Sequence, residues 1–334
     1  MLTTLTGIQP SGGLHLGNYF GAVEPCLRVQ ANLDRKLLVF LANYHALTTV
    51  HDGEVLHRHT QELALDLMAL GVDPSKTLLF RQSDVPEVTE LALLLSMVTG
   101  MGELQRAHSY KDKVSKGITP NVGLFFYPVL MAADILIYDT NKVPVGKDQH
   151  QHVQMAQSMG RHFNETFGEV FRIPEASISE IPKVPGIDGQ KMSKSYKNTI
   201  SPFLEGDELR ARVGQVVTSS TPFGEPLPTE GCPLFALLEL VLDDVTEIRE
   251  FFKLGRRGSK PFGYGHAKQI LVEAIESRFQ EERERRKTLT PDQVEHLLCA
   301  NGAKARELAR GKLDQARQAC GIRKVFRDSP VYFP

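Results

Sequence analysis

Two short stretches of the sequence carry side chains suited to holding phosphate. The first, Thr6–Asn18, reads T-G-I-Q-P-S-G-G-L-H-L-G-N and contains four glycines and one proline in thirteen residues, so its backbone can approach a ligand closely. It opens an apolar helical segment that begins near Leu14, and the N–H groups and dipole of a helix N-terminus favour phosphate. We interpret it as a nucleotide-binding loop. Taken alone, an ordinary strand–turn–helix corner explains it equally well.

The second stretch is Lys191–Ser195, which reads K-M-S-K-S and follows Gly189. Two lysines and two hydroxyls in five residues beside a glycine form a cationic segment that can clamp phosphates. A solvated polar loop is the usual explanation for such a pentapeptide. Its pairing with the first stretch favours a shared phosphate site.

The elements that must position these stretches alternate between buried strands and helices. Strand-like runs occur at Leu2–Leu5, Leu37–Ala42 and Thr77–Arg81, and helical patterns at Glu54–Leu70 and Glu87–Val98. Apolar strands separated by helices indicate a parallel, helix-covered α/β sheet. Such sheets bind ligands beyond the carboxyl ends of their strands, where Thr6–Asn18 begins.

The rest of the chain is expected to be mainly helical. Residues 102–161 read as helix broken at Pro120, Pro128 and Pro144, and Ile173–Gly189 reads as a connecting loop. Beyond Pro202 the helical patterns are Glu205–Val217, Pro233–Val241, Asp244–Lys253 and Ala267–Arg286. A helix capped by Thr290 reaches about Ala300, and Lys304–Ala319 continues helically to Gly321.

Composition excludes several classes of protein. The 334 residues are 41% hydrophobic and 24% charged with a formal net charge of −1, which argues against a surface that is basic throughout. No apolar run reaches the roughly 18–20 residues of a membrane span, and the first residues do not resemble a signal peptide, so we expect a cytoplasmic protein without a membrane partner. The four scattered cysteines fit reduced thiols.

The two phosphate-binding stretches resemble the signatures of class I aminoacyl-tRNA synthetases. His15-Leu16-Gly17-Asn18 matches the His-x-Gly-His/Asn element, and K-M-S-K-S is complete. Further stretches resemble the bacterial tryptophanyl-tRNA synthetase family, over residues 1 to about 215. They are G-I-Q-P-S-G (Gly7–Gly12), G-E-L-Q-R (Gly102–Arg106), Y-K-D-K (Tyr110–Lys113), M-A-A-D-I-L (Met131–Leu136) and V-P-V-G-K-D-Q-H-Q-H (Val143–His152).

The resemblance implies a fold, a domain order and a homodimer. We expect a Rossmann-like catalytic domain over residues 1–200, an all-helical tRNA anticodon-binding domain over 201–287, and C-terminal helices over 288–334 that pack back on the body. In the homodimer each tRNA would cross from the active site of one subunit to the helical domain of the other.

The resemblance also implies the residues that hold ATP and its Mg²⁺. The expected catalytic residues are Lys113, Lys191, Lys194 and Ser195. The other expected ATP contacts are Gln9, Pro10, Ser11, His15, Gly17, Asn18, Gly146, Asp148, Gln149, Met192 and Ser193. Activation joins an ionised carboxylate to a phosphate, so no general base is required, and electrostatic stabilisation suffices.

Asp134 is the pivotal residue for the amino acid. It lies in the apolar run Leu130–Ile137, where a carboxylate is costly without a partner. A buried Asp satisfied by its neighbours is one explanation; the resemblance implies that it accepts the indole N–H of tryptophan. The rest of the expected pocket is Leu5, Gly7, Gln9, His45, Tyr127, Met131, Val143, Val145 and Gln149. Leu5 replaces a phenylalanine that is frequent in bacterial relatives, which leaves tryptophan affinity open.

No metal site is expected in the protein itself. The histidines at 51, 57, 59, 150 and 152 lack completing ligands. Some relatives hold an iron–sulfur cluster with C-x22-C-x6-C-x2-C spacing, but after Cys232 the later positions here are Gly255, Phe262 and Gly265, so we expect no cluster.

The resemblance therefore implies a tryptophan–tRNA ligase whose partners are ATP, L-tryptophan and tRNA(Trp). Three alternatives remain at this stage. They are a tyrosine-specific synthetase of the same fold, a nucleotidylyltransferase that ignores tRNA, and a catalytically inactive paralogue that only binds tRNA.

Overall fold

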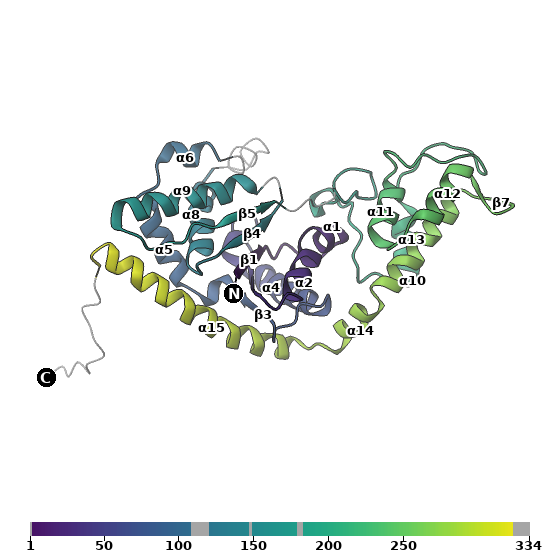
Figure 1. The fold of residues 1–334 in the computed structure, drawn as a ribbon. Coiled ribbons are helices and arrows are strands. Elements are labelled where there is room, and N and C mark those ends of the chain that lie inside the picture. The colour runs from purple at the N-terminus through teal and green to yellow at the C-terminus, as the bar shows by residue number, and fades with distance from the viewer. Residues whose placement is uncertain (1, 108–119, 147–148, 179–182, 323–334) are drawn as a thin grey trace.

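A parallel five-stranded sheet forms the centre of the first half of the chain (Figure 1). The computed structural model describes residues 2–107, 120–146, 149–178 and 183–322. The strands lie in the order β3-β2-β1-β4-β5, and all neighbours are parallel. They are β1 (Leu2–Ile8), β2 (Arg35–Leu41), β3 (Thr77–Arg81), β4 (Lys142–Val145) and β5 (Glu175–Ile178).

Both faces of the sheet are buried, and β2 shows how. Its side chains alternate: Leu37, Val39 and Leu41 face one core, and Leu38 and Phe40 face the other. The first core includes α2 (Glu24–Gln30) and α4 (Gly53–Ala69); the second includes α5 (Glu87–Ser96), α8 (Val122–Leu136) and α9 (His150–Phe167). Burial on both sides explains the continuous apolar run of this strand.

The strand order places the ligand crevice at β1 and β4. The chain goes from β1 outward to β2 and β3, then returns to the other side of β1 with β4 and β5. Ligands of open parallel sheets bind where this direction reverses, beyond the carboxyl ends of the strands. β1 ends at this edge with Ile8, and the neighbouring β4 ends at the same edge with Val145.

The sheet half of the chain and the K-M-S-K-S segment also contain short helical segments. They are α1 (Leu16–Asn18), the π-helix η1 (Tyr19–Val23), α3 (Asn43–Ala46), the 3-10 turns η2 (Gln82–Asp84) and η3 (Lys194–Tyr196), and α6 (Met101–Gln105). The π-helix directly follows the His15–Asn18 turn.

The second half of the described chain is mainly helical and extends away from the sheet (Figure 1). Its elements are α10 (Gly206–Gly214), α11 (Pro233–Val241), α12 (Thr246–Leu254), the two-residue strands β6 (Arg256–Arg257) and β7 (Lys260–Pro261), α13 (Tyr264–Arg278) and α14 (Gln280–Thr288). Its apolar side chains join the core on the α2–α4 face of the sheet in one cluster.

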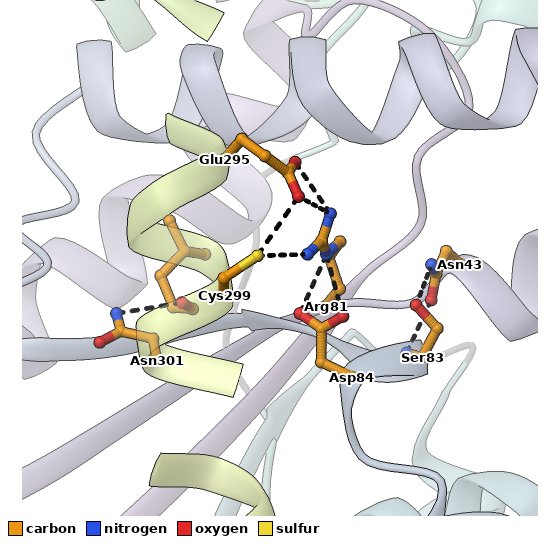
Figure 2. Close-up of polar contacts among 8 residues, drawn as sticks. Asn43, Arg81, Ser83, Asp84, Glu295, Cys299 and Asn301 are labelled. Carbon is orange, nitrogen blue, oxygen red and sulfur yellow. Dashed lines mark hydrogen bonds and ion pairs between the residues drawn. The ribbon is translucent and has the colours of Figure 1, made fainter. Parts of the chain in front are cut away.

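The long helix α15 (Pro291–Ala319) returns along the body and packs against β3, α4 and α5. Thr290 caps it in a capping box with Gln293. Figure 2 shows the polar contacts at its start: the Arg81 guanidinium donates to Asp84 at 2.9 Å and to Glu295 of α15 at 2.7 Å. Asn301 donates to the Leu79 carbonyl at 3.2 Å. These contacts fix the helix against the edge strand.

The structure confirms the α/β fold class and corrects several local predictions. β4 and β5 lie in segments that we expected to be helix and loop. The sequence did not indicate these strands because each has only four residues and β4 contains Pro144. Pro128 does not break its helix, which runs through it as α8. The single helix expected over Ala267–Arg286 is divided at Phe279, whereas the two expected after Thr290 are one. The domain boundaries at 200 and 287 stay predictions.

No helix among the described residues is long and apolar enough to cross a membrane.

Gly302 tests the close approach of α15 to the sheet. A Cβ built there would lie 2.7 Å from the Asp84 Cβ, so Gly302→Ala should lower the free energy of unfolding by about 1–3 kcal/mol. Gly311 lies on the same helix with nothing within 4 Å of its built Cβ, and Gly311→Ala should stabilise by up to about 1 kcal/mol. Urea denaturation of both variants measures this. Equal effects would contradict the packing described for α15.

Candidate active site

The turn after β1 is organised by His15. The ring nitrogen Nδ1 of His15 accepts from the Asn18 backbone N–H at 3.2 Å, and the backbone N–H of His15 donates to Asn18 Oδ1 at 3.3 Å. This reciprocal pair caps α1 in the way a capping box does. Gly17 lies inside the turn, where a Cβ would be 2.9 Å from the His15 ring. The turn therefore requires glycine at position 17.

His15 is a neutral hydrogen-bond donor. Burial and the nearby Lys194 lower its pKa to about 4, so the ring is uncharged at neutral pH. Because Nδ1 accepts a hydrogen bond, the single ring proton is on Nε2. A phosphate oxygen that approached this nitrogen would receive a hydrogen bond without proton transfer.

The K-M-S-K-S segment lies directly on this turn. The Lys194 ammonium donates to the Gly12 carbonyl at 2.8 Å and to Ser11 Oγ at 3.2 Å. Met192 is buried, and its sulfur accepts from the Gly17 N–H at 3.4 Å. The two stretches predicted to bind phosphate, more than 170 residues apart in the sequence, are therefore in direct contact.

Asn198, which was not predicted from the sequence, holds the K-M-S-K-S segment in place by hydrogen bonds. Asn198 is buried; its Oδ1 accepts from the Ser193 N–H at 2.7 Å, and its Nδ2 donates to Asp188 and to the Lys191 carbonyl. The Leu16 N–H donates to the Ile200 carbonyl at 2.9 Å. No motif in the sequence singles out Asn198, because its role depends on contacts with a loop.

The second half of the site contains the buried carboxylate of Asp134, on α8. Its Oδ2 is 2.9 Å from His45 Nε2 and accepts from Gln82 Nε2 at 2.8 Å. Burial raises the pKa of Asp134, and the hydrogen bonds from His45 and Gln82 oppose that shift. The two donors explain how a carboxylate can be held in this apolar setting.

Gln82 was also not predicted from the sequence. It is buried at the end of β3, and its Oε1 accepts from the Tyr44 N–H at 3.0 Å. It thus connects α3, which follows β2, to Asp134. Its position immediately after the predicted strand Thr77–Arg81 was a usable signal, since polar residues at carboxyl ends of parallel strands line ligand sites.

Gln9 connects the two halves. It follows β1, and its Nε2 donates to Tyr127 Oη at 3.4 Å. The Tyr127 ring lies 4.4 Å from the His45 ring, measured between centroids, and 5.7 Å from the His152 ring. His152 is in turn held by Gln149 at 2.8 Å.

The remaining predicted residues are distributed as follows. Leu5 is buried in β1, where Gly7 has no room for a Cβ because the Phe40 ring would be 2.4 Å away. Met131 and Val145 are half-buried, Val143 and Pro10 are buried, and Lys191 and Ser195 are exposed. Gly146 accepts from the Gln149 N–H. Lys113 and Asp148 lie outside the described residues, and the individual roles of all these residues stay predictions.

Comparisons with known proteins identify the family. The family profile described as tRNA synthetases class I (W and Y) matches residues 1–280. The tryptophan–tRNA ligase of Campylobacter jejuni is 43% identical, with 96% of this chain and 100% of the relative covered. That of Fusobacterium nucleatum is 45% identical, with 96% and 98% covered.

The chain belongs to the bacterial tryptophan–tRNA ligases. Among solved structures, the tryptophanyl-tRNA synthetase of C. jejuni in complex with ADP and tryptophan has a TM-score of 0.87 at 43% identity, covering 96% of this chain and 100% of that one. The Mycoplasma pneumoniae synthetase has a TM-score of 0.79 at 28% identity, with 96% and 98% covered. The synthetase described here is thus an aminoacyl-tRNA ligase with the fold of this family.

The charge state of His15 in this synthetase is directly testable. Its resonances in histidine-labelled protein, assigned by their loss in His15→Gln, should titrate with a midpoint of about 4. The unfolded chain binds this proton at about pH 6.5, so between 6.5 and 4 the unfolded state binds more protons and His15 reduces stability as the pH falls. A midpoint close to 6.5 would contradict the buried, neutral ring.

Proposed function

We propose that this ligase activates tryptophan in the crevice between β1 and β4, with ATP on the His15–Lys194 side and the amino acid on the Asp134 side. One observation carries the proposal: Gln9 and Tyr127 join a phosphate-binding turn to a buried carboxylate acceptor at the end of the same sheet.

Activation forms one bond and breaks one. A carboxylate oxygen of tryptophan attacks the α-phosphorus of ATP, the bond to the β-phosphate oxygen breaks, and pyrophosphate leaves with the electron pair. No proton moves, because the amino-acid carboxylate is already ionised at neutral pH. What the protein supplies is alignment and stabilisation of negative charge.

Residues from both signatures would supply that charge stabilisation. His15 Nε2–H and the backbone of the glycine-rich turn would donate to the phosphates, and Lys194, which lies on that turn, would add a positive charge. Lys191, Ser195 and Lys113 are proposed to act on the departing pyrophosphate. Mg²⁺ would compensate phosphate charge; no group of three His, Cys, Asp or Glu side chains able to hold a metal occurs among the described residues, so its ligands would be phosphates and water.

Selection of tryptophan would depend on the Asp134 carboxylate. The indole N–H is a donor that an ionised carboxylate accepts, and a pocket built around such a buried acceptor can reject an analogue without the donor by about 10⁴–10⁵-fold. His45 donates to Asp134 through Nε2, which leaves its buried Nδ1 as an acceptor without a partner among the described residues. We propose that Nδ1 accepts from the α-ammonium group of the substrate.

The tryptophanyl group would then pass from the adenylate to the 3′ end of tRNA(Trp), which would bind the helical segment.

We propose a homodimer in the cytoplasm. Four exposed apolar side chains on neighbouring helices support a subunit interface, because large exposed apolar patches mark such sites. They are Leu93 on α5, Met97 just after it, Met101 on α6 and Val122 on α8.

Amino-acid-dependent ATP–pyrophosphate exchange tests the activity. Exchange should require tryptophan and remain at background with tyrosine, because tyrosine has no indole N–H to give Asp134. Charging of tRNA(Trp) should follow. Exchange with tyrosine alone would favour the tyrosine-specific alternative; exchange without charging would favour a nucleotidylyltransferase, and neither reaction an inactive paralogue.

Asp134→Asn tests the indole acceptor. The change keeps the size of the side chain but replaces one oxygen by an NH₂ group, so the KM for tryptophan should rise about 100-fold or more, with the affinity for ATP unchanged. Asp207→Asn, at an exposed position on α10, is the control and should alter neither. Unchanged tryptophan affinity in Asp134→Asn would exclude the proposed contact.

A further inference from the structure

We propose that Asp66 is a positioning residue for the turn after β1, and that Arg286 of the helical segment holds the Asp66 carboxylate in place. The inference rests on the proposed function, since it names a residue that prepares the ATP site without touching ATP. Asp66 belongs to α4 and neither signature includes it.

Asp66 connects two distant parts of the chain through its two oxygens. Its side chain is only 2% exposed; Oδ2 accepts from the Leu14 N–H at 3.2 Å, and Oδ1 accepts from Arg286 Nε at 2.7 Å. Burial of a carboxylate is costly unless it is paired and hydrogen-bonded. Arg286 therefore compensates the buried Asp66 carboxylate, which accepts the hydrogen bond from the Leu14 N–H.

The backbone at Leu14 needs such an anchor. Gly12 has a φ of +101°, and nothing lies within 4 Å of a Cβ built on Gly13, so the turn has little packing at Gly13. The buried Leu14 side chain and hydrogen bonds to the backbone fix the turn on either side of it. The bond from Leu14 to Asp66 fixes the residue directly before His15, and the Gly12 carbonyl that binds Lys194 is two residues away on the other side.

The charge of Asp66 also acts on Lys194. Burial lowers the pKa of Lys194, and the negative charge of Asp66 opposes that shift. The carboxylate thus favours the charged form of the lysine that lies on the turn, in addition to fixing the turn itself.

A second contact holds the other end of the turn. Arg278 at the end of α13 donates to Glu24 at 3.1 Å, and its guanidinium carbon lies 5.4 Å from the Phe20 ring centroid. Phe279 packs edge-on against Tyr19 with centroids 4.8 Å apart. The α13–α14 segment therefore contacts both sides of the turn. Arg286, near the end of α14, acts before His15 through Asp66, and Arg278 and Phe279 at the α13–α14 junction contact the π-helix and α2 after Asn18.

Arg286 can be changed without disturbing a core. Its side chain is 39% exposed and lies over the Phe203 ring at 4.9 Å. Its neighbour Arg285 also joins α14 to α4, by donating to the Ala69 carbonyl at 2.6 Å, but does not contact Asp66. Arg285 therefore provides a matched control: it ties the same two helices together and does not support the turn.

The experiment compares Asp66→Asn, Arg286→Gln and Arg285→Gln in the full chain. We expect Asp66→Asn and Arg286→Gln to raise the KM for ATP in pyrophosphate exchange about tenfold or more, as expected for loss of a hydrogen bond to a charged group. The KM for tryptophan should stay within about twofold. Arg285→Gln should leave both KM values near those of the parent, and Arg286→Lys should partly restore ATP affinity.

Two further measurements complete the test. The double variant Asp66→Asn/Arg286→Gln should lose no more ATP affinity than the worse single variant, because both changes remove one linked contact. Calorimetric ATP binding gives the same comparison without catalysis, so failure of tryptophan exchange in the parent would reject the proposed function and still leave the role of Asp66 decided. A fall in melting temperature with unchanged ATP affinity, or an equal effect of Arg285→Gln, would overturn the positioning role.

Discussion

The site depends on the contact between the turn after β1 and the K-M-S-K-S segment. Lys194 donates to the Gly12 carbonyl and to Ser11 Oγ, and the Gly17 N–H donates to the Met192 sulfur. Just beyond the segment, the Ile200 carbonyl accepts from the Leu16 N–H. Most of these bonds use the backbone of the turn, which glycine at positions 12 and 17 allows to approach closely. The contact brings a lysine beside a histidine, and their proximity together with burial keeps that histidine neutral. Phosphate recognition, as proposed for this site, would therefore combine the positive charge of Lys194 with neutral donors.

Under the proposed function, a buried carboxylate would give the other half of the site its specificity for tryptophan. Asp134 is costly to hold in an apolar environment, and His45 and Gln82 offset that cost with hydrogen bonds to the same oxygen. The three residues come from α8, α3 and the end of β3, so the sheet and the helices on one of its faces must be assembled before the acceptor exists. Asp66 shows the same principle on the other face, where Arg286 and Leu14 satisfy a second buried carboxylate. The two carboxylates support opposite halves of one crevice.

The sequence was sufficient to predict the fold class, and it singled out many of the residues that the structure brings together at the candidate site, whose roles stay predictions. Glycine spacing, the paired lysines and the apolar run around Asp134 are local features, and resemblance to a known family joined them. Residues whose roles arise only from tertiary contacts could not be predicted. Asn198, Asp66 and Arg286 act through partners that are distant in the sequence, and nothing in their own neighbourhoods marks them. β4 and β5 were missed for a different reason, since four-residue strands carry too little periodicity to distinguish them from loops.

Under the proposed function, the buried Asp134 carboxylate accepts the indole N–H of tryptophan close to the turn after β1. The chain contains no tryptophan, so the fluorescence of added L-tryptophan reports its own binding when the indole band is excited at its red edge. Titration of the protein into L-tryptophan and into 1-methyl-tryptophan, which lacks the N–H, tests the claim most directly. The account predicts a saturable change in emission for tryptophan and none for the methylated analogue over the same protein concentrations. Equal affinity for the two ligands would contradict it.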